Sequence, residues 1–305
     1  MKRDFLAITD FTTEELRHAI RDAREMKRQR QLGQSPKSLA GLTVGCIFHK
    51  PSLRTRISFE TGIHELGGYS LYITKDEIDL GKRESIEDAA RVLSRYLGMI
   101  VIRTFSHADV EKLAKHAAIP VINGLTDFLH PCQVLGDLMT VEERFGKIDG
   151  LKVTYLGDGN NVSNSWINAA RRFPIDVTIA TAKDAPPSLD LLKLAQNEKA
   201  KVRWIHDPIE AVKGVHVIYT DVWASMGQKE KFEEKQKLLR PFQVNAELLK
   251  HADPHHIVLH CLPAERGREI TDEVMDGPHS AVFDQAENRL HIQKAIMAQL
   301  AAWSR

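Results

Sequence analysis

The chain has little of several features that mark particular protein classes. Its 42 lysines and arginines nearly balance its 41 aspartates and glutamates, which leaves a formal net charge of +1. Nucleic-acid-binding proteins usually carry a basic excess or a basic stripe, so we expect no nucleic-acid partner. No apolar run approaches the roughly 18–20 residues that a membrane helix requires, and the N-terminus carries no apolar signal segment. We therefore expect no membrane partner.

Cysteine is scarce as well. Cys46, Cys132 and Cys261 are far apart, and none belongs to a CxxC pair. A disulfide framework and a cysteine-pair zinc site are therefore excluded. Each cysteine taken alone is typical of a small buried hydrophobic residue, and the pattern fits a reducing cytoplasm.

Short apolar segments alternate with helical segments along two stretches of the chain, which predicts βαβ units and parallel sheets. In the first stretch we expect strands at 42–48, 70–74, 99–103 and 120–123, and helices at 12–30, 57–66, 85–96, 109–117 and 131–145. In the second stretch we expect strands at 151–156, 176–180, 202–204, 215–220 and 257–260, and a helix at 183–201. A final helix, 286–303, is followed by no strand.

At roughly 150 residues per domain, 305 residues predict two domains. The expected fold class is α/β, with two similar domains that each contain a parallel sheet flanked by helices. The C-terminal helix would return to the first domain. The predicted domains are 1–145 together with 286–305, and 146–285.

Polar motifs follow the predicted strands or begin the next helix. They are PSLRTR from Pro51, HPCQ from His130, GDGNN from Gly157, DVWASMG from Asp221 and HCLPAERG from His260. Each has an ordinary structural explanation by itself, such as an exposed basic turn or a packed core cysteine. Five motifs at the edge where open α/β sheets bind ligands favour a functional site.

The first motif is typical of an anion site, because it combines a helix N-terminus with two arginines. A nucleoside triphosphate is not favoured, since the chain has no glycine-rich triphosphate-binding motif. A dinucleotide-binding dehydrogenase domain is an alternative for the second half. Its signal is weak, because GDGNNVSNS lacks the third glycine of GxGxxG.

Taken together, the motifs resemble those of the transcarbamoylase family. PSLRTRISFE resembles the Ser-Thr-Arg-Thr-Arg carbamoyl-phosphate motif of that family, and HPCQVLGDLMT resembles its His-Pro-x-Gln helix. GDGNNVSNS, DVWASMG and HCLPAERGREI resemble the second-domain motifs of the ornithine-specific members. The similarity runs from FLAITDFTTEEL to QAENRLHIQKAIM, which is nearly the whole chain.

The resemblance implies an enzyme that transfers the carbamoyl group of carbamoyl phosphate to the δ-amine of L-ornithine, giving L-citrulline and phosphate. It also implies a cytoplasmic homotrimer with shared active sites, and neither a metal ion nor an organic cofactor. One alternative is a transcarbamoylase for a related amine, such as putrescine or an N-acylated ornithine. Another is a catalytically inactive binding protein. Asp221 favours ornithine, because a free α-ammonium group needs a carboxylate partner.

The resemblance further assigns roles to individual residues. Carbamoyl phosphate would be bound by Ser52, Leu53, Arg54, Thr55, Asp79, Arg103, His130, Gln133, Cys261, Leu262 and Arg289. Ornithine would be bound by Asn161, Asp221, Ser225 and Met226, with the Cys261 thiol near its δ-nitrogen. The catalytic residues would be Arg103, His130, Asp221, Cys261 and Arg289.

Two positions depart from the family pattern. Leu53 stands where threonine is commonest, which removes a hydroxyl group but no backbone N–H. Asp79 stands where the family often has glutamine or histidine reaching into a neighbouring subunit's site. A carboxylate there would repel a phosphate unless Lys82 or Arg83 compensates its charge.

Overall fold

The computed structural model describes residues 2–82, 84–223 and 232–304. It divides into two compact units, called unit 1 and unit 2 below. Unit 1 contains Met1–Met139 and Glu287–Arg305, and unit 2 contains Thr140–Ala286. The predicted domain boundary at 145 is the end of helix α5 (Pro131–Phe145), whose residues are shared between the two units.

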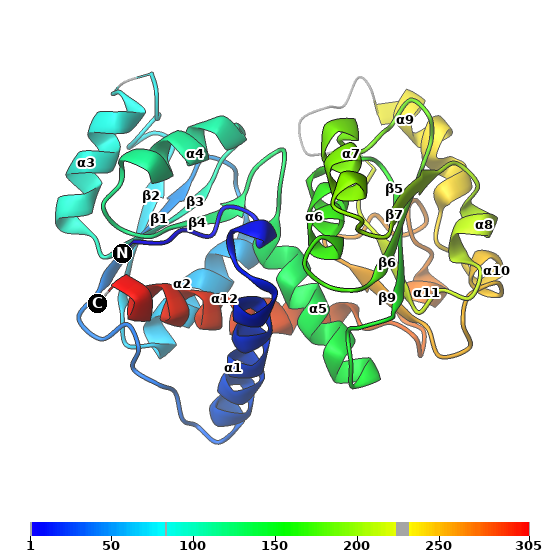
Figure 1. Ribbon diagram of the computed structural model, residues 1–305, viewed down its shortest axis with the longest axis horizontal. Coiled ribbons are helices and arrows are strands. Elements are labelled where there is room, and N and C mark those ends of the chain that lie inside the picture. The colour runs from blue at the N-terminus through cyan, green and yellow to red at the C-terminus, as the bar shows by residue number, and fades with distance from the viewer. Residues whose placement is uncertain (1, 83, 224–231, 305) are drawn as a thin grey trace. The chain divides into compact units, whose positions relative to one another are not determined.

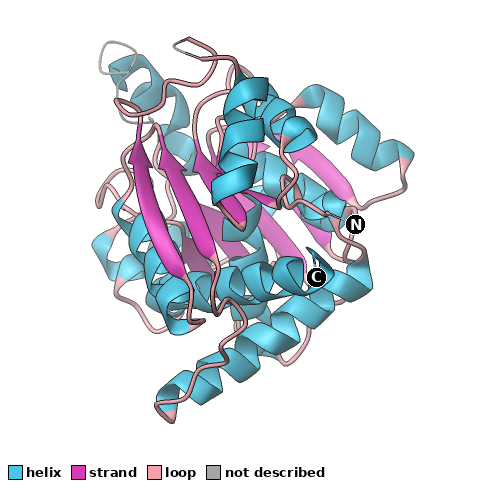
Figure 2. Cartoon of the chain, turned by 90° about the vertical axis from the view of Figure 1, so that its left-hand side faces the viewer, coloured by secondary structure: helices cyan, strands magenta, loops and turns pink. Residues whose placement is uncertain are grey.

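Unit 1 is built on a parallel sheet with the strand order β2-β1-β3-β4. These strands are β1 (Thr43–Phe48), β2 (Tyr69–Thr74), β3 (Met99–Arg103) and β4 (Val121–Leu125). Figure 2, in which this unit faces the viewer, shows the strands side by side and running in one direction. The helices are η1 (Ile8–Asp10), α1 (Thr13–Gln31), α2 (Leu53–Glu65), α3 (Ile86–Tyr96), α4 (His107–His116) and most of α12 (Val282–Ser304).

Helices cover both faces of this sheet (Figure 1). On one face α3 and α4 pack against the strands through a buried aliphatic cluster that includes Ile47, Ile100 and Val110. On the other face α2 contacts α12. The helices are so close at Gly62 that an added Cβ atom would lie 3.1 Å from Lys294 Cγ. Such coverage explains why β1 and β3 consist of nearly continuous apolar residues rather than alternating ones.

Helix α2 begins at Leu53, four residues before the predicted start at residue 57, so the predicted start is wrong. Ser52 is the reason, since its hydroxyl accepts a hydrogen bond from the Thr55 N–H at 3.3 Å and caps the helix. The motif PSLRTR is therefore the cap and first turn of a helix.

Unit 2 contains a second parallel sheet, with the order β7-β6-β5-β8-β9. Its strands are β5 (Lys152–Gly157), β6 (Asp176–Thr181), β7 (Val202–Ile205), β8 (Val217–Thr220) and β9 (Ile257–His260). Its helices are α6 (Asn161–Ala170), α7 (Leu189–Asn197), α8 (Pro208–Val212), α9 (Phe232–Leu239), η3 (Arg240–Phe242), α10 (Ala246–Leu249) and α11 (Asp272–Met275). Two parallel sheets flanked by helices confirm the predicted α/β class.

The two faces of the second sheet are covered differently. Side chains of α8, α10 and α11 share one apolar core with Leu156, Ile218 and Val258 of the strands. On the opposite face Trp166 of α6 packs edge-on against Tyr219 of β8, with 5.8 Å between the ring centroids.

The helix predicted at 183–201 is shorter than expected and covers only Leu189–Asn197. Ser188 caps it by accepting from the Leu191 N–H, and the two prolines before Ser188 keep the preceding segment outside the helix. Within the described ranges, no helix is both long enough and apolar enough to span a membrane.

A buried ion pair joins α2 to α12. Lys294 Nζ contacts Glu65 Oε2 at 2.6 Å, and the Lys294 side chain is 0% exposed. Arg30 of α1 also bonds Glu65, at 2.7 Å. Burial alone would raise the pKa of Glu65, but the hydrogen bonds from Lys294 and Arg30 outweigh it and lower that pKa.

We predict that Glu65→Gln lowers the free energy of unfolding by about 3–5 kcal/mol, because it leaves the Lys294 ammonium buried without its carboxylate. Asp176→Asn, which breaks the exposed pair with Lys201, should cost less than about 1 kcal/mol. Urea unfolding at pH 7 measures both. Since the pKa of Glu65 is lowered in the folded state, this stabilisation is complete above the ordinary value of 4.5 and is lost as the pH falls through the lowered pKa.

The double variant Glu65→Gln/Lys294→Met is the control for this interpretation. Removing both charges should recover part of the lost stability, because no buried charge is left unpaired. A double variant less stable than Glu65→Gln alone would show that the charge pair is not the cause.

Candidate active site

Each sheet reverses its winding direction at one point, where ligands bind in open α/β folds. In unit 1 this point lies between β1 and β3, so the turn that follows β1 meets the end of β3. In unit 2 it lies between β5 and β8. The motifs that begin at Pro51, Gly157 and Asp221 follow β1, β5 and β8 at these two places, whereas HPCQ and HCLPAERG come after the neighbouring strands β4 and β9.

In unit 1 the Thr55 hydroxyl is the meeting point of two arginines. Its Oγ1 accepts from Arg103 Nη1 at 3.1 Å and from Arg289 Nη2 at 2.8 Å. Thr55 is 0% exposed and Arg289 is 4% exposed. Two permanent cations are thus held against one neutral oxygen in a dry site, an arrangement suited to an anion.

His130 lies beside this pair, immediately before α5, and is 4% exposed. Burial, then the charges of Arg289 and Arg103, lower the pKa of His130 well below its ordinary value. The imidazole is therefore neutral near pH 7 and presents an N–H donor without adding a third positive charge.

The N-terminus of α2 supplies a further set of donors. Arg54 makes no ion pair with any residue that the structure describes, whereas Arg56 bonds Glu60 at 3.0 Å and stacks over the Tyr72 ring. Leu53 is 70% exposed, so it contributes no buried contact. Backbone N–H groups and Arg54 remain as the groups that can bind an anion at this helix end.

Gln133, in the first turn of α5, is 0% exposed and donates from Nε2 to Asp137 Oδ1 at 2.8 Å. Sequence analysis missed Asp137, although its position four residues after Gln133 on one helix was a usable signal. Asp79 lies in the loop between β2 and α3, and Lys82 Nζ is 3.6 Å from its carboxylate. Arg83, the other predicted compensating residue, is outside the described residues.

In unit 2 Asp221 is the centre of a second polar cluster, at the end of β8. Its Oδ2 accepts from Asn160 Nδ2 at 2.8 Å, and its Oδ1 accepts from the Cys261 thiol at 2.8 Å. Asn160 also caps α6 through its Oδ1, which accepts from the Val162 N–H. The predicted residue Asn161 is the first residue of that helix, and sequence analysis overlooked its neighbour Asn160.

Tyr155 of β5 belongs to the same cluster and was also missed, because it lies inside an apolar strand pattern. It is 0% exposed and stacks on Tyr219 with 5.8 Å between the ring centroids. Burial, followed by the charges of Asp221 and Asp158, raises its pKa well above the ordinary value. The phenol therefore stays protonated beside these carboxylates.

The turn after β9 is held by a buried histidine and a buried glutamate. His260 Nδ1 accepts from the Leu262 N–H at 2.9 Å, so its Nε2 carries the proton and donates to Glu269 Oε1 at 3.1 Å. Leu262 has a φ of 58°, a left-handed conformation that a leucine rarely adopts. The contacts of His260 and Glu269 fix the backbone of Cys261 and Leu262. Sequence analysis missed Glu269, which follows nine residues later.

Asp221, His260 and Cys261 place three potential metal-ligand atoms within 4.8 Å of one another. Both ring nitrogens of His260 are already engaged, however, one with the Leu262 N–H and one with Glu269. The donor set favours a hydrogen-bonded cluster over a metal site. Ser225 and Met226, predicted to bind ornithine, are outside the described residues.

The second glycine of GDGNN, Gly159, has a packing role. A Cβ atom at Gly159 would lie 2.1 Å from the carbonyl oxygen of Pro186, so glycine is required for packing against another segment of the chain. This local explanation removes the reason for a dinucleotide-binding interpretation.

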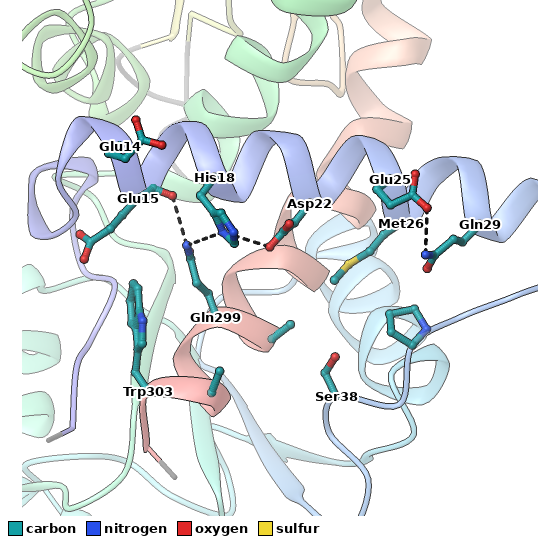
Figure 3. A pocket seen from close by; sticks show the side chains of 13 residues that line it. Glu14, Glu15, His18, Asp22, Glu25, Met26, Gln29, Ser38, Gln299 and Trp303 are labelled. Carbon is teal, nitrogen blue, oxygen red and sulfur yellow. Dashed lines mark hydrogen bonds and ion pairs between the residues drawn. The ribbon is translucent and has the colours of Figure 1, made fainter.

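A cavity of about 620 Å³ in unit 1 lies between α1 and the end of α12 (Figure 3). Glu14, Asp22 and Glu25 line it, and His18 Nδ1 lies 3.2 Å from both Asp22 Oδ2 and Gln299 Nε2. None of the predicted site residues lines this cavity. Its carboxylates would repel a phosphate.

Two family models together match almost the whole chain. The carbamoyl-phosphate-binding domain of aspartate/ornithine carbamoyltransferases matches residues 3–143, and the aspartate/ornithine-binding domain matches residues 149–300. The chain belongs to the aspartate/ornithine carbamoyltransferase family. Membership confirms the resemblance inferred from the five motifs and sets aside the dehydrogenase alternative.

Comparisons with individual proteins give the same family. The ornithine carbamoyltransferase of Thermococcus kodakarensis is 52% identical over 300 residues, covering 97% of this chain and 95% of that protein. The solved structure of the Pyrococcus furiosus ornithine carbamoyltransferase superposes with a TM-score of 0.93 at 49% identity, covering 97% and 96% of the two chains. The Thermus thermophilus enzyme gives 0.89 at 41% identity, covering 98% and 99%.

We predict that His130 is neutral at pH 6.5 in the unliganded protein, because its pKa is lowered by burial and by two arginines. Half of an unfolded histidine is protonated at about that pH. Two-dimensional NMR of the imidazole groups measures this, with His130→Gln identifying the signal. A midpoint at or above 6.5 would contradict the electrostatic argument.

Proposed function

We propose that this chain is an ornithine carbamoyltransferase, which transfers the carbamoyl group of carbamoyl phosphate to the δ-amine of L-ornithine and releases L-citrulline and phosphate. The observation that carries the proposal is the pair of arginines on Thr55 at the N-terminus of α2, in a chain about half identical to ornithine carbamoyltransferases. A buried double cation suits a dianionic phosphoryl ligand.

In this proposal unit 1 binds carbamoyl phosphate. The phosphate lies at Ser52, Leu53, Arg54 and Thr55, where backbone N–H groups and Arg54 donate. Arg103 and Arg289 turn their N–H groups from Thr55 to the ligand. Neutral His130 donates to the carbamoyl oxygen, and Gln133 contacts the carbamoyl nitrogen.

Unit 2 binds ornithine in the same proposal. The Asp221 carboxylate pairs with the α-ammonium group, and Asn161, Ser225 and Met226 hold the amino-acid end. The Cys261 thiol, which donates to Asp221, lies near the δ-nitrogen. The carbonyl groups of Cys261 and Leu262 accept from the carbamoyl nitrogen.

The reaction is a direct transfer. The neutral δ-amine attacks the carbamoyl carbon, an oxyanion develops on the carbamoyl oxygen, and phosphate leaves as the C–O bond breaks. Arg103, His130 and Arg289 stabilise that oxyanion, and losing one such donor typically costs about 3–4 kcal/mol of transition-state stabilisation. The amine loses its proton to solvent, and Cys261 forms no covalent bond.

We further propose a cytoplasmic homotrimer that works in arginine biosynthesis, with Asp79 and its loop, residues 76–84, completing a neighbouring subunit's site. All three cysteines are thiols rather than disulfides, which fits a reducing compartment. The edge strand β2 exposes Tyr69 and Leu71 to 65% and 40%, which supports an assembly that covers them. The Pyrococcus furiosus relative is named an anabolic enzyme.

Phosphate release from carbamoyl phosphate, with ornithine, putrescine, aspartate and N-acetylornithine compared side by side, tests the proposed reaction, and citrulline is the product expected with ornithine. We predict that ornithine exceeds putrescine at least tenfold in kcat/KM, because one charged hydrogen bond is worth about 1.5–3 kcal/mol. Asp221→Asn should lose most of the activity on ornithine and relatively less on putrescine. Equal losses on the two amines would refute the assignment of Asp221 to the α-ammonium group.

Subunit mixing tests the shared site. We predict that Arg54→Ala and Lys82→Ala are each nearly inactive, and that subunit exchange between them restores about one quarter of the wild-type activity, because random mixing gives that share of intact sites in a closed ring. Mixing each variant with itself is the control. Exchange without recovery would show that the loop does not enter a neighbouring site.

A further inference from the structure

Gln133 and Asp137 form a polar pair in the interior of unit 1. Both side chains are 0% exposed, and Gln133 Nε2 donates to Asp137 Oδ1 at 2.8 Å. They are four residues apart on α5, so one helix alone brings them together. A buried carboxylate is costly to keep, and an apolar residue would fill this position more stably.

The carboxylate decides how the Gln133 amide is oriented. In the structure Asp137 Oδ1 accepts from Gln133 Nε2, and within the amide only the NH₂ group donates. Turning the amide round would bring its oxygen against the Asp137 oxygen at hydrogen-bond distance. Asp137 therefore leaves Gln133 Oε1 as the atom offered to any other group.

Gln133 Oε1 is buried and has no hydrogen-bond partner among the residues that the structure describes. Burying an acceptor without a hydrogen-bond donor costs free energy, and a donor that reaches it removes this cost. The turn of α5 that carries Gln133 and Asp137 lies beside Arg289, one of the two arginines bonded to Thr55. A Cβ atom at Gly136 in this turn would be 3.6 Å from Arg289 Cγ. A ligand bound there with an N–H group would satisfy the oxygen.

We propose that Asp137 is a positioning residue: by fixing the Gln133 amide with its oxygen toward the ligand, it makes the site select a carbamoyl group, whose NH₂ donates, over an acyl group that cannot donate. This inference rests on the proposed function, in which Gln133 contacts the carbamoyl nitrogen. It explains why the site would bind carbamoyl phosphate more tightly than acetyl phosphate, in which a methyl group replaces the amino group.

The test compares three ligands on the assembled protein: carbamoyl phosphate, acetyl phosphate and inorganic phosphate. Dissociation constants for wild type, Asp137→Ala and Gln133→Ala come from calorimetry or from competition. We expect Asp137→Ala to weaken carbamoyl phosphate by about 10- to 100-fold, the effect of one buried hydrogen bond. Acetyl phosphate and inorganic phosphate should change less than about twofold, because neither bonds to Gln133 Oε1.

Two variants serve as controls. In Gln133→Ala the preference for carbamoyl over acetyl phosphate should already be lost, and adding Asp137→Ala should reduce it no further. Asp137→Asn keeps the shape of the side chain, and its amide can pair with Gln133 in either orientation, so its preference should lie between those of wild type and Gln133→Ala. This variant carries the test if Asp137→Ala fails to fold.

Equal weakening of all three ligands in Asp137→Ala and Asp137→Asn would show a merely structural role and overturn the proposal. An unchanged preference in both variants would overturn it as well. The proposed function fails separately: a wild-type protein that prefers carbamoyl phosphate but makes no citrulline refutes the reaction and leaves the role of Asp137 intact.

Discussion

The Thr55 hydroxyl accepts one hydrogen bond from Arg103 and another from Arg289. This pair of bonds is the constraint on which the arrangement of unit 1 depends. The two arginines are 48 and 234 residues away from Thr55 in the chain. Their guanidinium groups repel each other. Water does not screen this repulsion, because Thr55, which both groups contact, is 0% exposed. Holding them together before a ligand arrives requires a rigid frame, and the frame must bring the C-terminal helix back to the first unit.

The packing of α2 on α12 supplies that frame. Gly62 lets the helices approach. The buried pair of Lys294 and Glu65 fixes them about one and a half turns from Arg289 along α12 and about three turns from Thr55 along α2. A charge pair at this place opposes any sliding of one helix along the other, because each partner would become buried and unpaired. The contact therefore holds in register the two helices that carry Thr55 and Arg289.

Sequence patterns predicted the strands and the family well, and helix limits less well. The start of α2 was missed because Pro51 and Ser52 suggest a turn, while the hydroxyl of Ser52 actually caps a helix. The helix at 183–201 was predicted too long because it was taken to begin around the two prolines, which lie outside the helix that Ser188 caps. Periodicity reports which side chains are buried, whereas caps decide where a helix begins.

The sequence motifs contain the groups that the proposal places at the ligand, but they do not reveal the groups that act through another residue. Arg103, His130 and Arg289 lie close together, whereas Asp137, Asn160, Tyr155 and Glu269 were overlooked. The overlooked groups are buried polar side chains, each costly unless hydrogen-bonded, and the local pattern of a strand or helix does not reveal which atom they hold. Unit 1 gathers cations around a neutral histidine, and unit 2 gathers a carboxylate, a thiol and a protonated phenol. The first set suits an anion and the second a cation, which is the charge division that a phosphorylated donor and an amino-acid acceptor require.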